Sequence, residues 1–213
     1  MKPVSAFRAR IAGRVPGILD AVIDIAVLDT CIEFCEKTLV VRGMLDTFST
    51  VALDRDYDLM PANQQSVAKV IRVWCDNNEI TPVDDDAIGN PFGFVSSVAG
   101  HGVDKGRPRY YNEVEPGVLS LYPIPDAAYV INARVALRPT RSATHVPDAL
   151  FENWCEAIVN GSLARLMMQP GEAMNPKLAS LHQGLYVVEV NKALLAANRG
   201  NTRAQSTVRP VHI

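Results

Sequence analysis

The pattern of apolar and polar residues changes period twice along the chain. From residue 16 to residue 37, apolar side chains recur every three or four positions. This stripe consists of Ile18, Val22, Ile25, Ile32 and Cys35. The spacing predicts a helix over 17–37 whose wide apolar face is buried against other helices.

After Arg42 the apolar residues alternate with polar ones, as they do in strands. Alternating segments lie at 51–59, 67–74, 108–114, 117–122 and 128–138. Short spacing between strands favours antiparallel pairing. The glycine-rich stretch 81–106 predicts a long connection. Residues 42–138 are therefore predicted to form a β-rich insertion.

Helical spacing returns after Pro139 and predicts helices over 147–168 and 176–198. Pro170-Gly171 ends the first, and Gly200 is placed to cap the second. The expected buried stripe of the first helix is Leu150, Phe151, Trp154, Ile158, Leu163 and Leu166. The expected buried stripe of the second is Leu178, Leu181, Leu185, Val188 and Leu195.

These elements predict an α+β protein, in which one N-terminal and two C-terminal helices form a bundle with an inserted antiparallel β-sheet and hairpin region. We expect flexible termini on either side of it. The predicted organisation is an N-terminal arm over 1–15, a single domain over 16–199 and a C-terminal tail over 200–213.

Charge is unevenly distributed, although the net charge is only −2. That value excludes a strongly basic nucleic-acid-binding protein. Residues 1–17 and 199–213 carry arginines and no acid, whereas residues 46–86 are rich in aspartate. Solvated ends and loops explain this pattern as well as a functional role does.

The sequence predicts a protein that stays in a reducing cytoplasm and does not cross a membrane. Acidic residues at 20, 24, 29 and 33 interrupt the longest apolar stretch. The N-terminus has no continuous apolar segment of the kind found in signal peptides. Cys31, Cys35, Cys75 and Cys155 show no CxxC spacing, which favours free thiols packed in the core.

No sequence motif for catalysis, cofactor binding or metal binding is present. The chain lacks a phosphate-binding glycine loop, a nucleophile elbow, HExxH and zinc-type spacings. The acidic run from Asp54 to Asp58 begins like a calcium loop but has Leu59 and Gln65 where glycine and glutamate are required. Cys155 with His145 or His182 is the one candidate nucleophile and base. We therefore predict no catalytic residue, no cofactor and no metal.

Several short segments together resemble the head–tail adaptor proteins of tailed phages, akin to the tubular tail protein A family. They span residues 16–199 and carry FCEKT at 34–38, YDLMP at 57–61, LSLYPIPD at 119–126, LRP at 137–139, PDALFENW at 147–154, AIVNGSLARL at 157–166 and NP at 175–176. The resemblance implies a non-enzymatic virion protein at the head–tail junction, assembled in the host cytoplasm.

The resemblance also implies partners. Such adaptors form a ring, commonly of twelve copies, below the portal protein; the ring extends the DNA channel and carries the next tail or nozzle protein. Genome DNA passes without sequence-specific binding. The implied portal-docking residues lie in the C-terminal tail and are Arg203, Val208, Arg209, Val211 and Ile213. The alternatives are another virion ring protein, such as a stopper or tail terminator, and a small Cys/His hydrolase.

Overall fold

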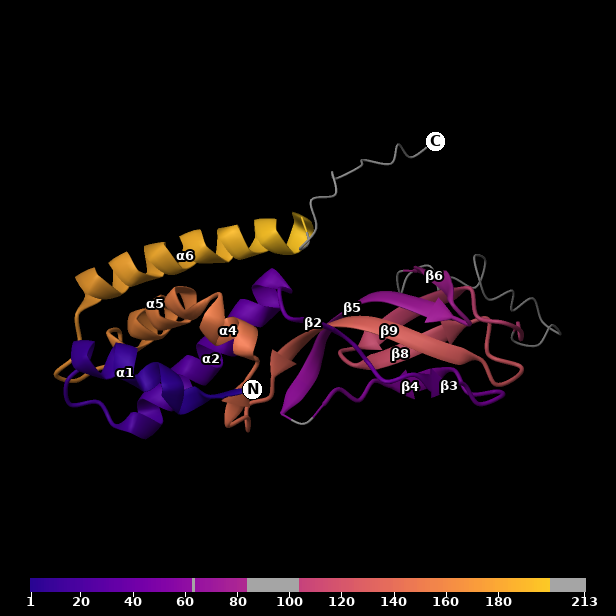
Figure 1. The fold of residues 1–213 in the computed structure, drawn as a ribbon, viewed down its shortest axis with the longest axis horizontal. Coiled ribbons are helices and arrows are strands. Elements are labelled where there is room, and N and C mark those ends of the chain that lie inside the picture. Colours follow the sequence, from indigo (N-terminus) through magenta and orange to yellow (C-terminus); the bar gives the residue numbers. More distant parts are fainter. Residues whose placement is uncertain (63, 84–103, 200–213) are drawn as a thin grey trace. The chain divides into compact units, whose positions relative to one another are not determined.

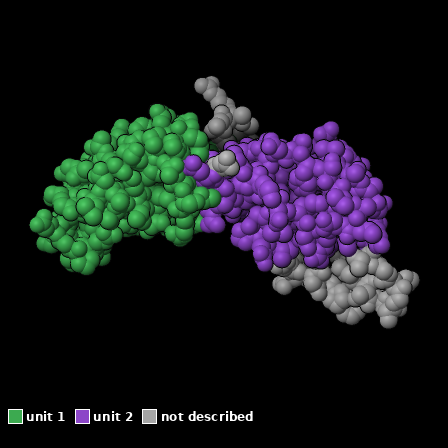
Figure 2. Space-filling view, turned by 90° about the horizontal axis from the view of Figure 1, so that it is seen from below, with its two compact units in different colours: residues 1–41, 139–213 green, residues 42–138 purple. Residues whose placement is uncertain are grey.

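A computed structural model describes residues 1–62, 64–83 and 104–199, and the chain divides into two compact units (Figures 1 and 2). Unit 1 combines Met1–Val41 with Pro139–Ile213, and unit 2 is Arg42–Arg138. Unit 1 is mainly helical, and unit 2 is built from strands. The structure confirms the α+β class, because unit 2 occupies the segment where the hydrophobic period falls to two.

Unit 1 is built around a central helix, α5 (Cys155–Leu166). This helix packs against α2 (Asp20–Thr38) and α6 (Pro176–Arg199), and Figure 1 shows it running beneath α6. Gly161 makes the close packing possible. A Cβ atom there would lie 2.5 Å from Thr30 Cγ2 of α2 and 2.9 Å from Tyr186 Cδ2 of α6. No larger side chain fits this crossing without displacement of its neighbours.

The N-terminal residues are part of this core, so the prediction of an arm over 1–15 is wrong. They form β1 (Lys2–Pro3), η1 (Val4–Phe7), α1 (Arg8–Ile11) and η2 (Ala12–Arg14), and β1 pairs antiparallel with β10 (His145–Val146). Phe7, Ile11 and Val15 are at most 1% exposed. Their helical spacing provides an apolar face that drives packing, although the basic residues between them had suggested a solvated segment.

The predicted helix over 147–168 is two helices, α4 (Asp148–Glu152) and α5. The backbone leaves helical geometry at Trp154, with φ −126° and ψ 21°. This change of direction packs the half-buried indole against Phe34, with ring centroids 5.7 Å apart. Leu150, Ile158, Leu163 and Leu166 are buried as predicted. Phe151 and Trp154, predicted in the same stripe, are only half-buried at the edge of the core.

Helix α6 buries a different face from the one the sequence predicted. Its buried residues are Ala179, Tyr186, Val190, Ala193 and Ala197. The five predicted core residues, Leu178, Leu181, Leu185, Val188 and Leu195, are 42–57% exposed. The physical reason is the short distance between α5 and α6, which admits small side chains at most of the contact positions.

Unit 2 is an eight-stranded, curled sheet with a separate apolar core. Its strands are β2 (Arg42–Met44), β3 (Phe48–Ser49), β4 (Asp56–Asp58), β5 (Gln65–Cys75), β6 (Asn78–Pro82), β7 (Tyr110–Glu115), β8 (Val118–Tyr122) and β9 (Val130–Pro139). The order is β2-β9-β5-β6-β7-β8-β4, and β3 also pairs with β9. Val73, Leu119, Leu121, Ile131 and Val135 are fully buried within it.

One pairing in unit 2 departs from the predicted antiparallel arrangement. Strands β6 and β7 are parallel, with Thr81 opposite Tyr110 and Pro82 opposite Tyr111. Parallel neighbours need a long connection, and residues 83–109 separate these two strands. The predicted strand over 51–59 is also shorter than expected, because only β4 forms and Leu53 has a left-handed φ of 70°.

Candidate functional surfaces

The structure does not bring Cys155 into a reaction centre with either described histidine, His145 or His182. The Cys155 thiol is buried, and desolvation raises its pKa, which disfavours the nucleophilic thiolate. Nδ1 of His182 lies 2.9 Å from Asn160 Oδ1, and Nδ1 of His145 lies 3.0 Å from Thr144 Oγ1. Desolvation and the charge of Arg14 lower the pKa of His182. These partners explain the histidines without a catalytic role.

The acidic run at 54–58 is likewise structural. Tyr57 donates its hydroxyl to the carbonyl oxygens of Val51 (3.1 Å) and Asp54 (2.9 Å), which folds the segment back on itself. Asp56 is bound by Arg55 and accepts a hydrogen bond from Ser120. Burial raises the pKa of Asp56, but the hydrogen bonds from Ser120 and Arg55 outweigh it and the net shift is downward. Among the described residues, no group of three potential ligands could hold a metal ion.

Lys2, Arg8 and Arg10 of the N-terminal segment form ion pairs within unit 1. Arg8 donates to Asp20 at 2.9 Å and to both carboxylate oxygens of Asp24. Three further pairs join the segment to α4 and α5: the N-terminal amine with Asp148 (2.8 Å), Lys2 with Glu152 (3.2 Å) and Arg10 with Glu156 (3.1 Å). Arg8 and Arg10 therefore hold the N-terminal segment against α2 and α5.

The predicted docking residues Arg203, Val208, Arg209, Val211 and Ile213 lie outside the described residues. The last described residue before them is Arg199, at the end of α6.

Helix α6 carries an apolar surface that we call the α6 ridge, formed by Leu178, Leu181, Leu185, Val188 and Leu195. The spacing of these residues keeps them on one side of the helix, turned away from the buried Tyr186 and Val190. Exposed apolar surface of this extent on a soluble protein marks an interaction site. Lys177, Lys192 and Arg199 lie on the same side, and Lys192 pairs with Glu189 at 2.5 Å.

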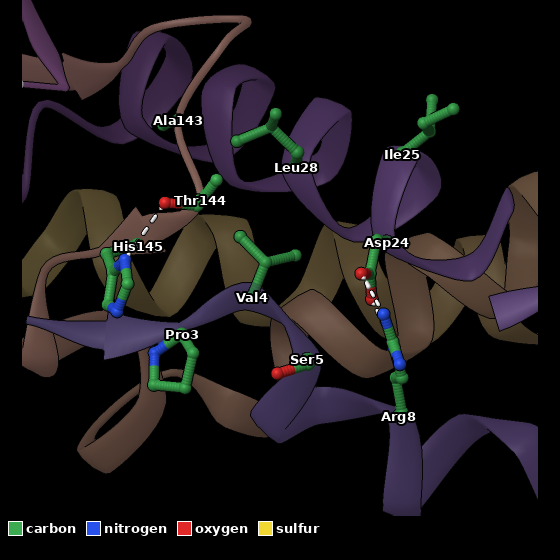
Figure 3. Close-up of a pocket in the computed structure, with 10 residues that line it drawn as sticks. All are labelled: Pro3, Val4, Ser5, Arg8, Asp24, Ile25, Leu28, Ala143, Thr144 and His145. Atoms are coloured by element: carbon green, nitrogen blue, oxygen red, sulfur yellow. Dashed lines mark hydrogen bonds and ion pairs between the residues drawn. The ribbon is translucent and has the colours of Figure 1, made fainter. Parts of the chain in front are cut away.

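A second apolar surface is a pocket of about 380 Å³ on α2, which we call the α2 groove (Figure 3). Three segments enclose it: α2 with Asp24, Ile25 and Leu28; the N-terminal segment with Pro3, Val4, Ser5 and Arg8; and residues 143–145 before α4. Ile25 is 61% exposed at its edge. The ion pair between Arg8 and Asp24 crosses the groove at one end.

The sequence identified the residues of the ridge but assigned them to the core, and it did not identify the groove. Ile25 was placed in a buried stripe for the same reason. The sequence did contain an indication of both surfaces, because α2 and α6 each have apolar residues on more than one side of the helix. A helix that is apolar on two sides needs a packing partner for each side. The core of unit 1 covers only one side of each of these helices.

No helix in the described part of the chain is both long and apolar enough to span a bilayer. The family model for SU10 adaptor proteins matches residues 4–211, which is nearly the whole chain. A comparison with curated proteins found no significant match. The match covers both units. The chain therefore belongs to the SU10 adaptor protein family, and it is a structural, non-catalytic head–tail adaptor of a phage.

Proposed function

We propose that this adaptor forms a ring below the phage portal, extends the DNA channel and provides the platform to which the next tail component attaches. The observation that carries the proposal is the family match over residues 4–211. The proposed place is the head–tail junction of the virion, and twelve copies are expected in the ring. The exposed ridge on α6 supports self-assembly, because an isolated subunit would leave it in water.

The exposed acidic residues around β4 of unit 2 suit a surface past which DNA must slide. Around β4, Asp46, Asp54 and Asp58 are exposed and Arg55 is paired with Asp56, whereas the exposed Lys69, Lys105, Arg109 and Arg134 lie on other strands and connections of the unit. Free lysines and arginines would bind phosphates by releasing counterions and would retard the genome. We infer that exposed acids of unit 2 contribute to a channel wall that DNA passes without being gripped.

The C-terminal tail is the proposed portal anchor. Arg203 and Arg209 are suited to acidic groups on the portal, and Val208, Val211 and Ile213 are suited to shallow apolar pockets. Because residues 1–15 are packed in unit 1, the C-terminal segment is the better candidate of the two basic ends.

The test is to mix the full chain with its cognate portal and to examine the particles by negative-stain electron microscopy and analytical ultracentrifugation. We expect rings attached to the portal. A chain lacking residues 201–213 should melt at nearly the same temperature and should lose portal binding. The double variant Arg203→Glu/Arg209→Glu keeps the tail length and separates charge from extension. Binding to the end of a tail tube, and none to the portal, would identify a terminator and overturn the proposal.

A further inference from the structure

The orientation of α6 is opposite to that of an ordinary helix on a protein surface. Val188 and Val190 are two residues apart and therefore about 200° apart around the helix. Val190 is 8% exposed and Val188 is 50% exposed. The core thus receives mostly alanine from α6, while the leucines of the ridge face outward over about 26 Å, the rise of a helix from residue 178 to residue 195. Such an arrangement is expected when the outer face is buried in an assembly.

The α2 groove faces away from the core in the same manner. Thr30 of α2 lies against Gly161 of α5, whereas Leu28 lines the groove. These two residues are again about 200° apart around their helix. The ridge and the groove therefore both face away from α5, on different sides of unit 1. A subunit with two different apolar surfaces can bind a copy of itself head to tail.

The charges beside the two surfaces are complementary. On the ridge side, Lys177, Lys192 and Arg199 outnumber Glu189. Asp24 and Arg8 line the groove, and Asp20 and Asp29 flank it on α2. These three acids pair with only two arginines, Arg8 and Arg141. The ridge side is thus net basic and the groove side net acidic. Complementary charges of this kind favour ridge-to-groove contact and disfavour ridge-to-ridge contact.

We propose that the α6 ridge of one adaptor subunit docks into the α2 groove of the next subunit. The proposal rests on the ring-forming function proposed above and specifies its subunit interface. A head-to-tail contact between two different surfaces generates a closed ring when the rotation between copies closes, whereas a contact between identical surfaces stops at a dimer. The partner of the ridge is therefore a second copy of this chain.

Neighbouring valines on α6 provide a matched test. Val188 belongs to the ridge, and Val187 is 46% exposed on another side of the helix. Both Val188→Glu and Val187→Glu place a carboxylate on an exposed helical position, so both variants should fold. We expect Val188→Glu to raise the concentration at which the full chain oligomerises by at least about tenfold, because it places a charge in a desolvated contact. Val187→Glu should leave assembly unchanged.

A mixing experiment tests the head-to-tail geometry. Ile25→Glu disables the groove and leaves the ridge intact, while Val188→Glu does the reverse. Each variant alone should sediment as a monomer. An equimolar mixture should yield heterodimers that do not grow further, because one ridge and one groove remain competent. No other arrangement of the two surfaces gives this result.

The outcomes separate this inference from the proposed function. Equal effects of the two valine variants, or a mixture without heterodimers, would overturn the inference. Wild-type chains that bind the portal singly would overturn it too and leave portal docking standing. Wild-type oligomers that require Val188 but do not bind the portal would support the interface and overturn the placement below the portal.

Discussion

Helices α5 and α6 lie side by side in unit 1, and both are rich in apolar residues, but their surroundings differ. In α5 all residues except Glu156 and Arg165 are buried, including Asn160 and Ser162. In α6 the buried residues are Ala179, Tyr186, Val190, Ala193 and Ala197, and the leucines of the ridge are exposed. The difference teaches that α5 is the centre of the subunit, whereas α6 covers it on one side and presents an apolar surface on the other.

The largest expected effect comes from truncating a leucine on each helix. Leu163 of α5 is fully buried, so Leu163→Ala should lower the free energy of unfolding by about 2–5 kcal/mol. Leu185 of α6 is 45% exposed, and Leu185→Ala should cost less than about 1 kcal/mol. Urea denaturation of both variants, at a concentration where the wild type is monomeric, measures the difference. Similar losses in the two variants would break the comparison.

Glycine-to-alanine changes should have opposite signs on the two helices. At Gly161 a Cβ atom would meet Thr30 Cγ2 at 2.5 Å, so Gly161→Ala should destabilise by about 1–3 kcal/mol through overpacking, reduced by the better helix propensity of alanine. At Gly184 of α6 no atom lies within 4 Å of the added Cβ. Gly184→Ala should stabilise by about 0.5–1 kcal/mol. Thermal unfolding of the pair tests both signs, and a stabilised Gly161→Ala protein would contradict the close packing.

The contact between α5 and α6 also buries a polar atom, the hydroxyl oxygen of Tyr186, and this burial lowers the stability of unit 1. The hydroxyl of Tyr186 is buried and has no hydrogen-bond partner among the described residues. Burial also raises the pKa of this phenol. Tyr186→Phe should therefore stabilise unit 1 by about 1 kcal/mol, because it removes an unsatisfied buried group and keeps the ring against Phe34. Chemical denaturation measures the gain, and a loss of stability would show that the hydroxyl has a partner.

The smallest effect concerns pH. Glu33 of α2 is bound by Lys37 and by Arg165 of α5. Burial raises the pKa of Glu33, but these hydrogen bonds and charges outweigh it, and the pKa falls below the ordinary value of 4.5. Because the folded-state pKa is the lower one, the ion pairs stabilise the fold above pH 4.5, and this contribution is lost as the pH falls through the folded-state pKa.

Two carboxylate variants isolate this contribution. Glu33→Gln should be less stable than the wild type at neutral pH, and the difference should disappear in acid. Glu189→Gln on α6 is the control, since its i,i+3 pair with Lys192 lies within one helix and contributes only about 0.2–0.5 kcal/mol. The free energy of unfolding of the wild type and both variants, measured from neutral to acid pH, tests this prediction. An effect of Glu33→Gln that does not change with pH would contradict a stabilising role of the ion pairs.

The sequence predicted most of the fold because its elements leave strong local patterns. Alternation identified β5, β7, β8 and β9, and helical spacing identified α2 and α6. The turn between β5 and β6 falls at Asp76 and Asn77, whose φ angles of 45° and 66° suit a tight hairpin. Strands β2 and β3 are too short to show alternation, and they form because β9 offers hydrogen-bonding partners.

The candidate surfaces were harder to predict than the family. Short segments distributed over residues 16–199 indicated a head–tail adaptor, and the family match over 4–211 confirms it. The predicted docking residues at 203–213 remain a prediction. The ridge and the groove were missed because a leucine in a helix has the same pattern whether it faces the subunit's core or the surface of an assembly.

The sequence by itself determined the α+β class, the limits of the β-rich insertion and the absence of a catalytic motif, since all three depend on residues close together in the chain. The tertiary structure decided which side of α6 is buried and where the N-terminal residues pack. The physical reason is that burial depends on the neighbour: the lack of a side chain at Gly161 brings α5 close to Tyr186 and to Thr30 of α2. That close approach leaves room for alanine in the core and turns the leucines of the α6 ridge outward.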